Sequence, residues 1–110
     1  MKNEFVKYEQ ALALKELGFD EPCLGYYDEG GNLYTEMVEV LKAPLYQQAF
    51  RWFREKHKIV AAITVRNDDF DYTIFIPWNI EYYEDNTKYN TYEEAEQACM
   101  NNVIEIVNNK

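Results

Sequence analysis

The sequence contains no serine, one histidine and only two cysteines, Cys23 and Cys99. Without serine, every catalytic scheme that depends on a serine nucleophile is excluded. Two cysteines are too few for a disulfide framework, and a single histidine (His57) with no Cys-x-x-Cys motif argues against a structural zinc site. Since no catalytic motif is recognisable, the sequence predicts a protein that is not an enzyme and needs no cofactor or metal.

Long hydrophobic runs are also missing. A membrane-spanning helix needs about 18 or more consecutive apolar residues, and no stretch approaches that length. The start, M-K-N-E-F-V, has no apolar core of a signal peptide. Neither an internal repeat nor a linker interrupts the chain. We therefore expect one globular domain over residues 1–110, away from membranes and in a reducing cytoplasm.

Basic residues are few compared with acidic ones, and the formal net charge is −9. Binding to the phosphate backbone requires clustered Lys and Arg, so this charge argues against duplex nucleic acid as a partner. The chain is rich in tyrosine, with ten residues of this type. Because tyrosine offers a large contact area at a low entropic cost, it is enriched at binding surfaces.

Residues 43–57, A-P-L-Y-Q-Q-A-F-R-W-F-R-E-K-H, predict a strongly amphipathic helix. Pro44 suits the first helical position, where its missing N–H costs nothing. At about 100° per residue the apolar and aromatic side chains fall on one arc. The members of this arc are Leu45, Tyr46, Ala49, Phe50, Trp52, Phe53 and His57. We expect this helix to lie at the centre of the core, with Phe50 and Phe53 largely buried.

Two further helices are predicted near the ends of the chain. Residues 8–17 carry an apolar stripe, and Gly18 fits the left-handed residue that ends a helix, with Phe19 packing back on Leu14. The last helix begins after T-Y-E-E, where Thr91 caps the N-terminus, and it runs to about Val107.

Two hairpins lie between these helices. Residues 23–37 indicate two short strands around Gly30 and Gly31, and residues 58–78 indicate two longer strands around an acidic turn, 67–71. Residues 79–90 are polar and turn-prone, with a short extension at Ile80 to Tyr83. The order α-ββ-α-ββ-α predicts an α+β two-layer fold, with an antiparallel sheet of about four strands and three helices mainly on one face.

Three blocks of the sequence are similar to a known group of proteins. The blocks K-Y-E-Q-A-L-A-L-K-E-L-G-F-D-E-P-C, A-P-L-Y-Q-Q-A-F-R-W-F-R-E-K and T-Y-E-E-A-E-Q-A-C cover both ends and the centre of the chain. They resemble short proteins of tailed phages and prophages of gut bacteria of the Bacteroides kind. The resemblance implies a phage or prophage origin and the cytoplasm of an infected cell, and it carries no residue role. Lys7 departs from the pattern, because a capping Thr would fit better there.

Several charged groups have alternative interpretations. Arg51 and Arg54 could contact an anionic metabolite or nucleotide, although a solvated helix face with Glu55 paired to Arg51 is the simpler interpretation. Three carboxylates of the acidic turn could hold a hard cation, but their spacing is not that of an EF-hand loop. These carboxylates are Asp68, Asp69 and Asp71. The histidine at the helix end has no evident orienting carboxylate, which disfavours a general base.

The tyrosine pairs provide the favoured hypothesis. In an extended chain, two adjacent side chains point to opposite sides of a sheet. One ring of the pair Tyr26–Tyr27 and one ring of the pair Tyr82–Tyr83 should therefore lie on the open face. Carboxylates near these rings complete the predicted interaction surface, namely Asp28, Glu81 and Glu84. We therefore expect a non-enzymatic, phage-encoded interaction protein that binds a host protein or a second copy of itself, with a small anionic-ligand or nucleotide binding protein that uses the face of Arg51 and Arg54 as the alternative.

Overall fold

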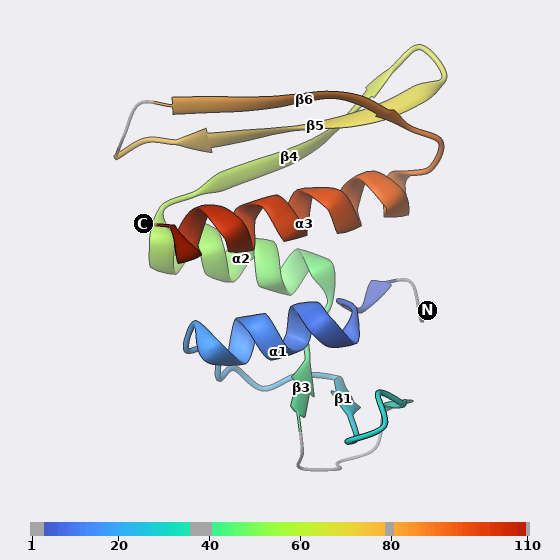
Figure 1. Ribbon diagram of the computed structural model, residues 1–110, viewed down its shortest axis with the longest axis vertical. Coiled ribbons are helices and arrows are strands. Elements are labelled where there is room, and N and C mark those ends of the chain that lie inside the picture. The colour runs from blue at the N-terminus through green and yellow to red at the C-terminus, as the bar shows by residue number, and fades with distance from the viewer. Residues whose placement is uncertain (1–3, 36–40, 79–80, 110) are drawn as a thin grey trace. The chain divides into compact units, whose positions relative to one another are not determined.

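The computed structural model describes residues 4–35, 41–78 and 81–109, and for Arg66 and residues 81–86 it describes the backbone alone. The chain forms two compact units, Met1–Ala49 and Phe50–Lys110, called the N-terminal and C-terminal units below. Figure 1 shows the helices and strands of both units along the chain. Helix α2 (Tyr46–His57) begins in the first unit and continues into the second.

The N-terminal unit combines one helix with a small antiparallel sheet. Helix α1 (Tyr8–Glu16) packs against β3 (Leu41–Ala43). The strand order is β2-β1-β3, so β1 (Gly25–Tyr27) is central and β2 (Leu33–Tyr34) lies at one edge. The core of this unit combines residues of α1, β1, β3 and the start of α2 with residues of the segment before α1 and of the turn after it. It consists of Phe5, Val6, Ala11, Leu14, Phe19, Tyr27, Leu41, Ala43, Tyr46 and Ala49.

The end of α1 confirms the predicted stop signal. Gly18 has φ 98°, the left-handed conformation that glycine adopts without a steric penalty. The N–H of Phe19 donates to the carbonyl of Leu14 at 3.0 Å, and both side chains are buried. Together with the bond from the Gly18 N–H to the carbonyl of Lys15 at 3.1 Å, this hydrogen bond forms the Schellman motif. At the other end, Gln10 Oε1 accepts the N–H of the N-cap residue Lys7 at 2.8 Å, which is the bond that the N3 side chain makes in a capping box.

Helix α2 begins later than predicted. Pro44 precedes the helix, and its carbonyl accepts the N–H of Val6 at 3.0 Å. Leu45 forms an isolated bridge with Phe5, so the chain is still extended there. The aromatic face is largely as expected, since Trp52 and Phe53 are buried, whereas Phe50 is only half-buried.

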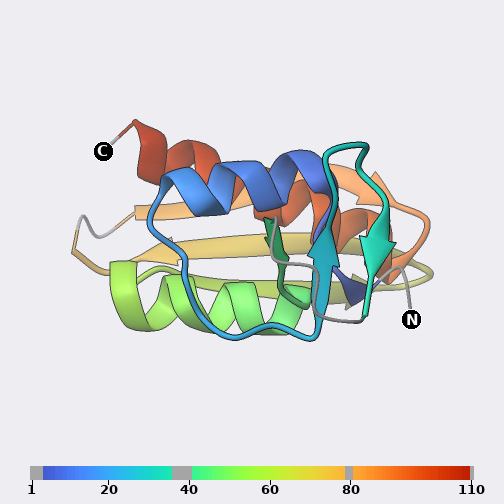
Figure 2. The same cartoon turned by 90° about the horizontal axis from the view of Figure 1, so that it is seen from below.

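The C-terminal unit is a three-stranded antiparallel sheet with helices on one face. The strands are β4 (Val60–Arg66), β5 (Asp69–Ile76) and β6 (Glu81–Tyr89), in the order β4-β5-β6. Helix α3 (Tyr92–Asn108) packs mainly on the central strand β5. Figures 1 and 2 show α2 and α3 on the same face of this sheet, with α2 on the β4 side.

The alternation of side chains along β5 explains which face is covered. Tyr72, Ile74 and Ile76 are buried, whereas Thr73 and Phe75 between them are half-buried. The buried set belongs to the helix-covered face, because successive residues of a strand point to opposite sides. From α3 the core receives Ala95, Cys99, Met100, Val103, Ile104 and Val107. Strand β5 ends immediately before Pro77, which cannot donate a hydrogen bond to a ladder.

The α+β class with three helices is confirmed, but the expectation of about four strands in two hairpins is wrong in detail. The two sheets have three strands each, because β3 and β6 join the predicted hairpins. The acidic turn is also shorter than predicted, since only Asn67 and Asp68 lie outside the strands. The expectation of one domain over residues 1–110 stays a prediction. Among the described helices, none is long and apolar enough to cross a bilayer.

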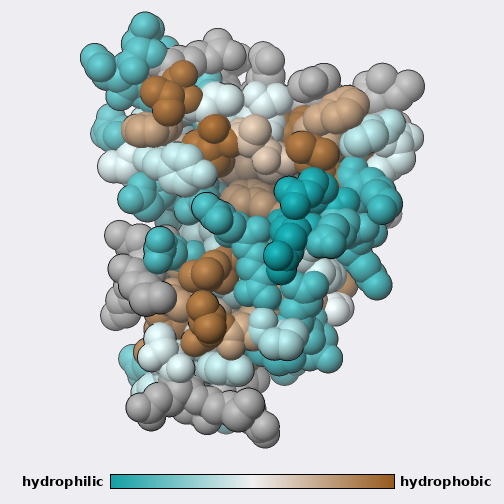
Figure 3. All heavy atoms as spheres, turned by 180° about the vertical axis from the view of Figure 1, so that it is seen from behind, coloured by the Kyte–Doolittle hydropathy of each residue, from teal (hydrophilic) through white to brown (hydrophobic). Residues whose placement is uncertain are grey.

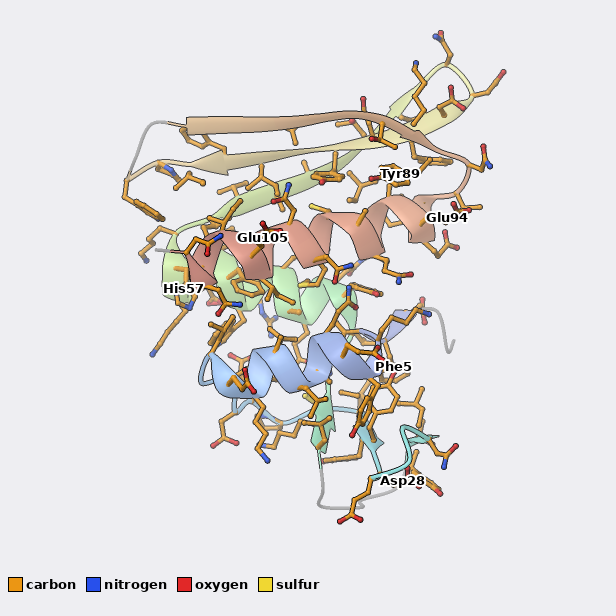
Figure 4. All side chains as sticks on the ribbon, viewed as in Figure 1. Phe5, Asp28, His57, Tyr89, Glu94 and Glu105 are labelled. Atoms are coloured by element: carbon orange, nitrogen blue, oxygen red, sulfur yellow. The ribbon has the colours of Figure 1, made fainter. Side chains whose placement is uncertain are left out.

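The predicted cap of α3 is confirmed and gives a testable expectation. Thr91 Oγ1 accepts the N–H of Glu94 at 3.1 Å, at the helix end labelled by Glu94 in Figure 4. Thr91→Ala removes this acceptor, so we expect a loss of about 1 kcal/mol in the free energy of unfolding, measured by urea denaturation. Thr91→Asn keeps an acceptor and should remain close to the parent. An unchanged denaturation midpoint for Thr91→Ala would contradict the role of the cap.

Candidate functional site

Strand β1 separates the adjacent tyrosines Tyr26 and Tyr27 onto opposite faces of the N-terminal sheet. Tyr27 is buried, and its hydroxyl donates to the carbonyl of Val6 at 2.6 Å. Its ring meets that of Tyr8 edge to face, with 5.6 Å between the centroids, and burial raises the pKa of the Tyr27 phenol. Tyr26 is half-buried on the other face. Tyr27 is thus the structural member of the pair and Tyr26 the accessible one.

Tyr26 has a second tyrosine beside it. In the ladder, Tyr26 pairs with Tyr34 of β2 and with Lys42 of β3, so the three residues form a row across the sheet. Directly paired residues of antiparallel strands point to the same face. Tyr34 is 41% exposed. We call Tyr26, Tyr34 and Lys42, together with Asp28 at the end of β1, the tyrosine face.

Asp28 fixes the ring of Tyr34. One carboxylate oxygen of Asp28 accepts the N–H groups of Gly30 and Asn32, both at 2.9 Å. The other oxygen accepts the Asn32 side-chain amide at 3.2 Å and the Tyr34 hydroxyl at 3.0 Å. The hydrogen bonds from Asn32, Tyr34 and Gly30 lower the pKa of the Asp28 carboxyl, and the bond to Asp28 raises the pKa of the Tyr34 phenol. The charged carboxylate therefore holds the exposed ring in one orientation at neutral pH.

Lys42 lies at the other end of the tyrosine face, on β3. Its ammonium group lies 2.8 Å from Asp20 Oδ1, and this hydrogen bond raises the pKa of Lys42 and lowers that of Asp20. Nearby Cys23 is half-buried, and its thiol donates to the carbonyl of Glu21 at 3.3 Å. Burial raises the pKa of Cys23 to about 11, so the thiol stays protonated and is a poor nucleophile at neutral pH.

The second predicted tyrosine pair belongs to β6 of the C-terminal unit. In the register, Tyr82 pairs with Phe75, Tyr83 with Ile74 and Glu84 with Thr73. The side chains of Glu81, Tyr82, Tyr83 and Glu84 lie outside the described residues, so their place on a surface stays a prediction.

Arg51 and Arg54 are both exposed on α2. Arg51 Nε lies 3.7 Å from Glu55 Oε1, in the i, i+4 pair that the sequence suggests. Both side chains of this pair are more than half exposed, so its contribution to stability is small. An anion contact at Arg51 and Arg54 stays a prediction.

His57 lies at the end of α2 among aromatic rings. Its ring is 5.1 Å from that of Trp52 and 5.8 Å from that of Phe53, between centroids. The carbonyl of His57 accepts the indole N–H of Trp78 at 2.9 Å, close to the position labelled in Figure 4. These contacts make His57 part of the packing at the helix end.

Two of the three carboxylates of the predicted acidic turn, Asp69 and Asp71, contact side chains of the neighbouring strands. Thr64 Oγ1 donates to Asp71 Oδ1, and Lys88 Nζ lies 3.9 Å from Asp69 Oδ2. Within the part of the chain that the structure describes, no group of three or more His, Cys, Asp or Glu side chains is placed to hold a metal ion. On α3 the carboxylate residue Glu96 is buried, at 6% exposure.

Sequence reasoning missed Tyr34, because its importance depends on the turn that brings it to Asp28. It also did not single out Trp78, which is 46% exposed. The only sequence signal for Tyr34 is the Asp28–Gly30–Gly31–Asn32 turn, which places the two strands in register. No family model, curated protein or solved structure matches the chain.

Proposed function

We propose that this chain is a non-enzymatic protein that binds another protein through the tyrosine face. The observation that carries the proposal is an exposed aromatic ring that is already oriented: Tyr34 is 41% exposed, and its hydroxyl is bonded to an Asp28 carboxylate fixed by three further hydrogen bonds. A side chain held in its binding conformation loses little entropy when a partner docks. Tyrosine is one of the residues that are enriched among interface hot spots.

The charges around the face indicate the kind of partner. Asp28 and the adjacent Glu29 are acidic, and the chain as a whole carries −9. A partner with a basic patch around an apolar pocket would complement both the ring and its rim, and the net charge would speed the encounter. With the phage or prophage origin implied by the sequence resemblance, the partner would be a protein of the infected host cell.

The experiment is a capture assay with the immobilised chain and host lysate, followed by mass spectrometry and a direct titration of the captured protein. The double variant Tyr26→Ala/Tyr34→Ala is expected to weaken that complex by at least 2 kcal/mol, roughly a 30-fold rise in Kd. Its melting temperature should stay within a few degrees of the parent, since both rings are partly exposed.

Leu24→Ala provides the matched control. Leu24 is 61% exposed just before β1, so its loss removes apolar surface outside the tyrosine face. It should bind like the parent. Full affinity of the Tyr26→Ala/Tyr34→Ala variant for the captured protein would refute the proposal.

A further inference from the structure

Strand β4 forms an edge of the C-terminal sheet and has few of the features that prevent an edge from pairing with another strand. Among the described strands, β4 is paired with β5 alone. Its first six residues, V-A-A-I-T-V, include no charge, proline or glycine, and Val60 and Val65 are 42% and 64% exposed. An exposed apolar edge is a template for another strand, and natural proteins normally blunt it with charges, prolines or bulges.

The opposite edge of this sheet, strand β6, does have features that hinder pairing with another strand. The β5–β6 ladder has a register shift between Phe70 and Tyr72, and β6 carries charged residues along its length. These residues are Glu81, Glu84, Asp85 and Lys88. The β4–β5 ladder runs without a shift from Val60↔Phe75 to Arg66↔Asp69. The contrast indicates that β4 is kept open for pairing while β6 is not.

The register identifies the backbone groups that an added strand would meet. A two-residue turn, Asn67–Asp68, closes the β4–β5 hairpin, so the closing pair Arg66 and Asp69 is hydrogen-bonded. Hydrogen-bonded and non-hydrogen-bonded pairs alternate in an antiparallel ladder. Counting back from the turn, Ala61, Ile63 and Val65 direct their N–H and C=O groups away from β5.

The position of α2 decides between two occupants of this edge. Figure 2 shows α2 on the β4 side of the sheet. If β4 of a second copy paired antiparallel with β4, both α2 helices would lie on the same face of the joined sheet, and helices about 10–12 Å across would collide over strands about 4.8 Å apart. A single extended segment brings no helix with it, so it fits where an antiparallel second copy does not.

The charge beside the edge indicates the composition of that segment. The exposed side chains of α2 and the residue after it include a concentration of basic groups in an otherwise acidic chain, namely Arg51, Arg54, Lys56 and Lys58. In Figure 3, hydrophobic surface extends across the upper part of the molecule, with strongly hydrophilic residues immediately below it. An acidic segment would complement these groups.

We infer that the β4 edge is a second binding surface, separate from the tyrosine face, which takes an extended acidic segment of a partner protein as an additional strand. Main-chain hydrogen bonds from Ala61, Ile63 and Val65 supply the affinity, as in other cases of strand addition. The basic groups of α2 select acidic side chains on the added strand.

A synthetic peptide of about eight residues that alternates Glu and Val tests this inference, with the Lys and Val counterpart as its control. By fluorescence anisotropy at low salt, the acidic peptide should bind at least about tenfold more tightly than the basic one. In hydrogen exchange measured by NMR, it should slow the amides of Ala61, Ile63 and Val65.

Val65→Pro removes one outward N–H and leaves the β4–β5 ladder intact, so it should weaken peptide binding about tenfold with little change in melting temperature. Val65→Thr keeps the N–H and nearly the same shape, and it should bind like the parent. Arg51→Glu/Arg54→Glu, at two exposed positions, is a second variant and should weaken binding of the acidic peptide.

Three outcomes would overturn the inference: no binding at millimolar peptide, equal binding of the basic peptide, or a Val65→Pro variant that binds as the parent does. A dimer in sedimentation velocity that Val65→Pro dissociates would also overturn it, because the occupant would then be a second copy. Tyr26→Ala/Tyr34→Ala should leave peptide binding unchanged, so a failure here is distinct from a failure of the tyrosine face.

Discussion

Phe53→Ala is expected to lower the free energy of unfolding by about 3–5 kcal/mol. The Phe53 side chain is 1% exposed, and its ring contacts the Trp52 ring at a centroid distance of 5.0 Å. Its loss removes the apolar burial of a whole ring and leaves a cavity that rigid neighbours fill only partly. The loss would consume a large share of the total stability of a small protein. Urea denaturation followed by circular dichroism measures it.

Two neighbouring changes separate the cavity from other effects. Arg54→Ala alters the next residue of the same helix, which is exposed, and should change the stability by no more than about 0.5 kcal/mol. Phe53→Leu keeps most of the volume and should cost less than Phe53→Ala. If Phe53→Ala melted within a few degrees of the parent, α2 would not be an essential part of the core.

The helix ends were predictable because their signals are local. Thr91 caps α3 through an atom three residues away, and Gly18 ends α1 through its own backbone conformation. Such interactions depend on neighbours in the sequence, so the pattern of residues contains them.

Strand β3 was missed, and β6 was predicted only as a short extension at Ile80 to Tyr83, because the stability of both strands comes from distant partners. β3 has only three residues and pairs with β1, whose Tyr27 faces Leu41 across 14 positions of sequence. β6 contains turn-prone and charged residues, which a strand at the edge of a sheet tolerates on its solvent side. Pro44 was placed in the helix because its propensity fits there, whereas pairing with the segment before α1 keeps it extended.

The candidate site was predictable only in part. The alternation of side chains along an extended strand predicted that Tyr26 and Tyr27 would lie on opposite faces of the sheet, and they do. The bond from Tyr34 to Asp28 could not be predicted, because it requires the exact turn that places residue 34 over residue 28. The edge β4 was predicted as a strand, but its position at the edge follows from the strand order, which the sequence does not contain.

Gly25→Ala is expected to cost about 1–3 kcal/mol although it adds a single methyl group. A Cβ atom at this position would lie 2.6 Å from Cε1 and 2.8 Å from Cδ1 of Phe5, and 3.2 Å from the carbonyl oxygen of Ala43. The Phe5 ring is 1% exposed and has little room to move. Thermal unfolding of the purified variant should therefore show a clear fall in the melting temperature.

A double-mutant cycle shows whether the Phe5 ring is the cause. Phe5→Leu shortens the side chain that the new methyl group would meet, so Gly25→Ala should cost less in the Phe5→Leu background than in the parent. Gly30→Ala is the control for glycine replacement as such, because a Cβ at Gly30 would meet no buried ring and no backbone atom, only Asn32 Nδ2 at 3.3 Å and Asp28 Oδ1 at 3.4 Å. If the two changes at Gly25 and Phe5 were additive, β1 would not approach Phe5 as closely as the structure shows.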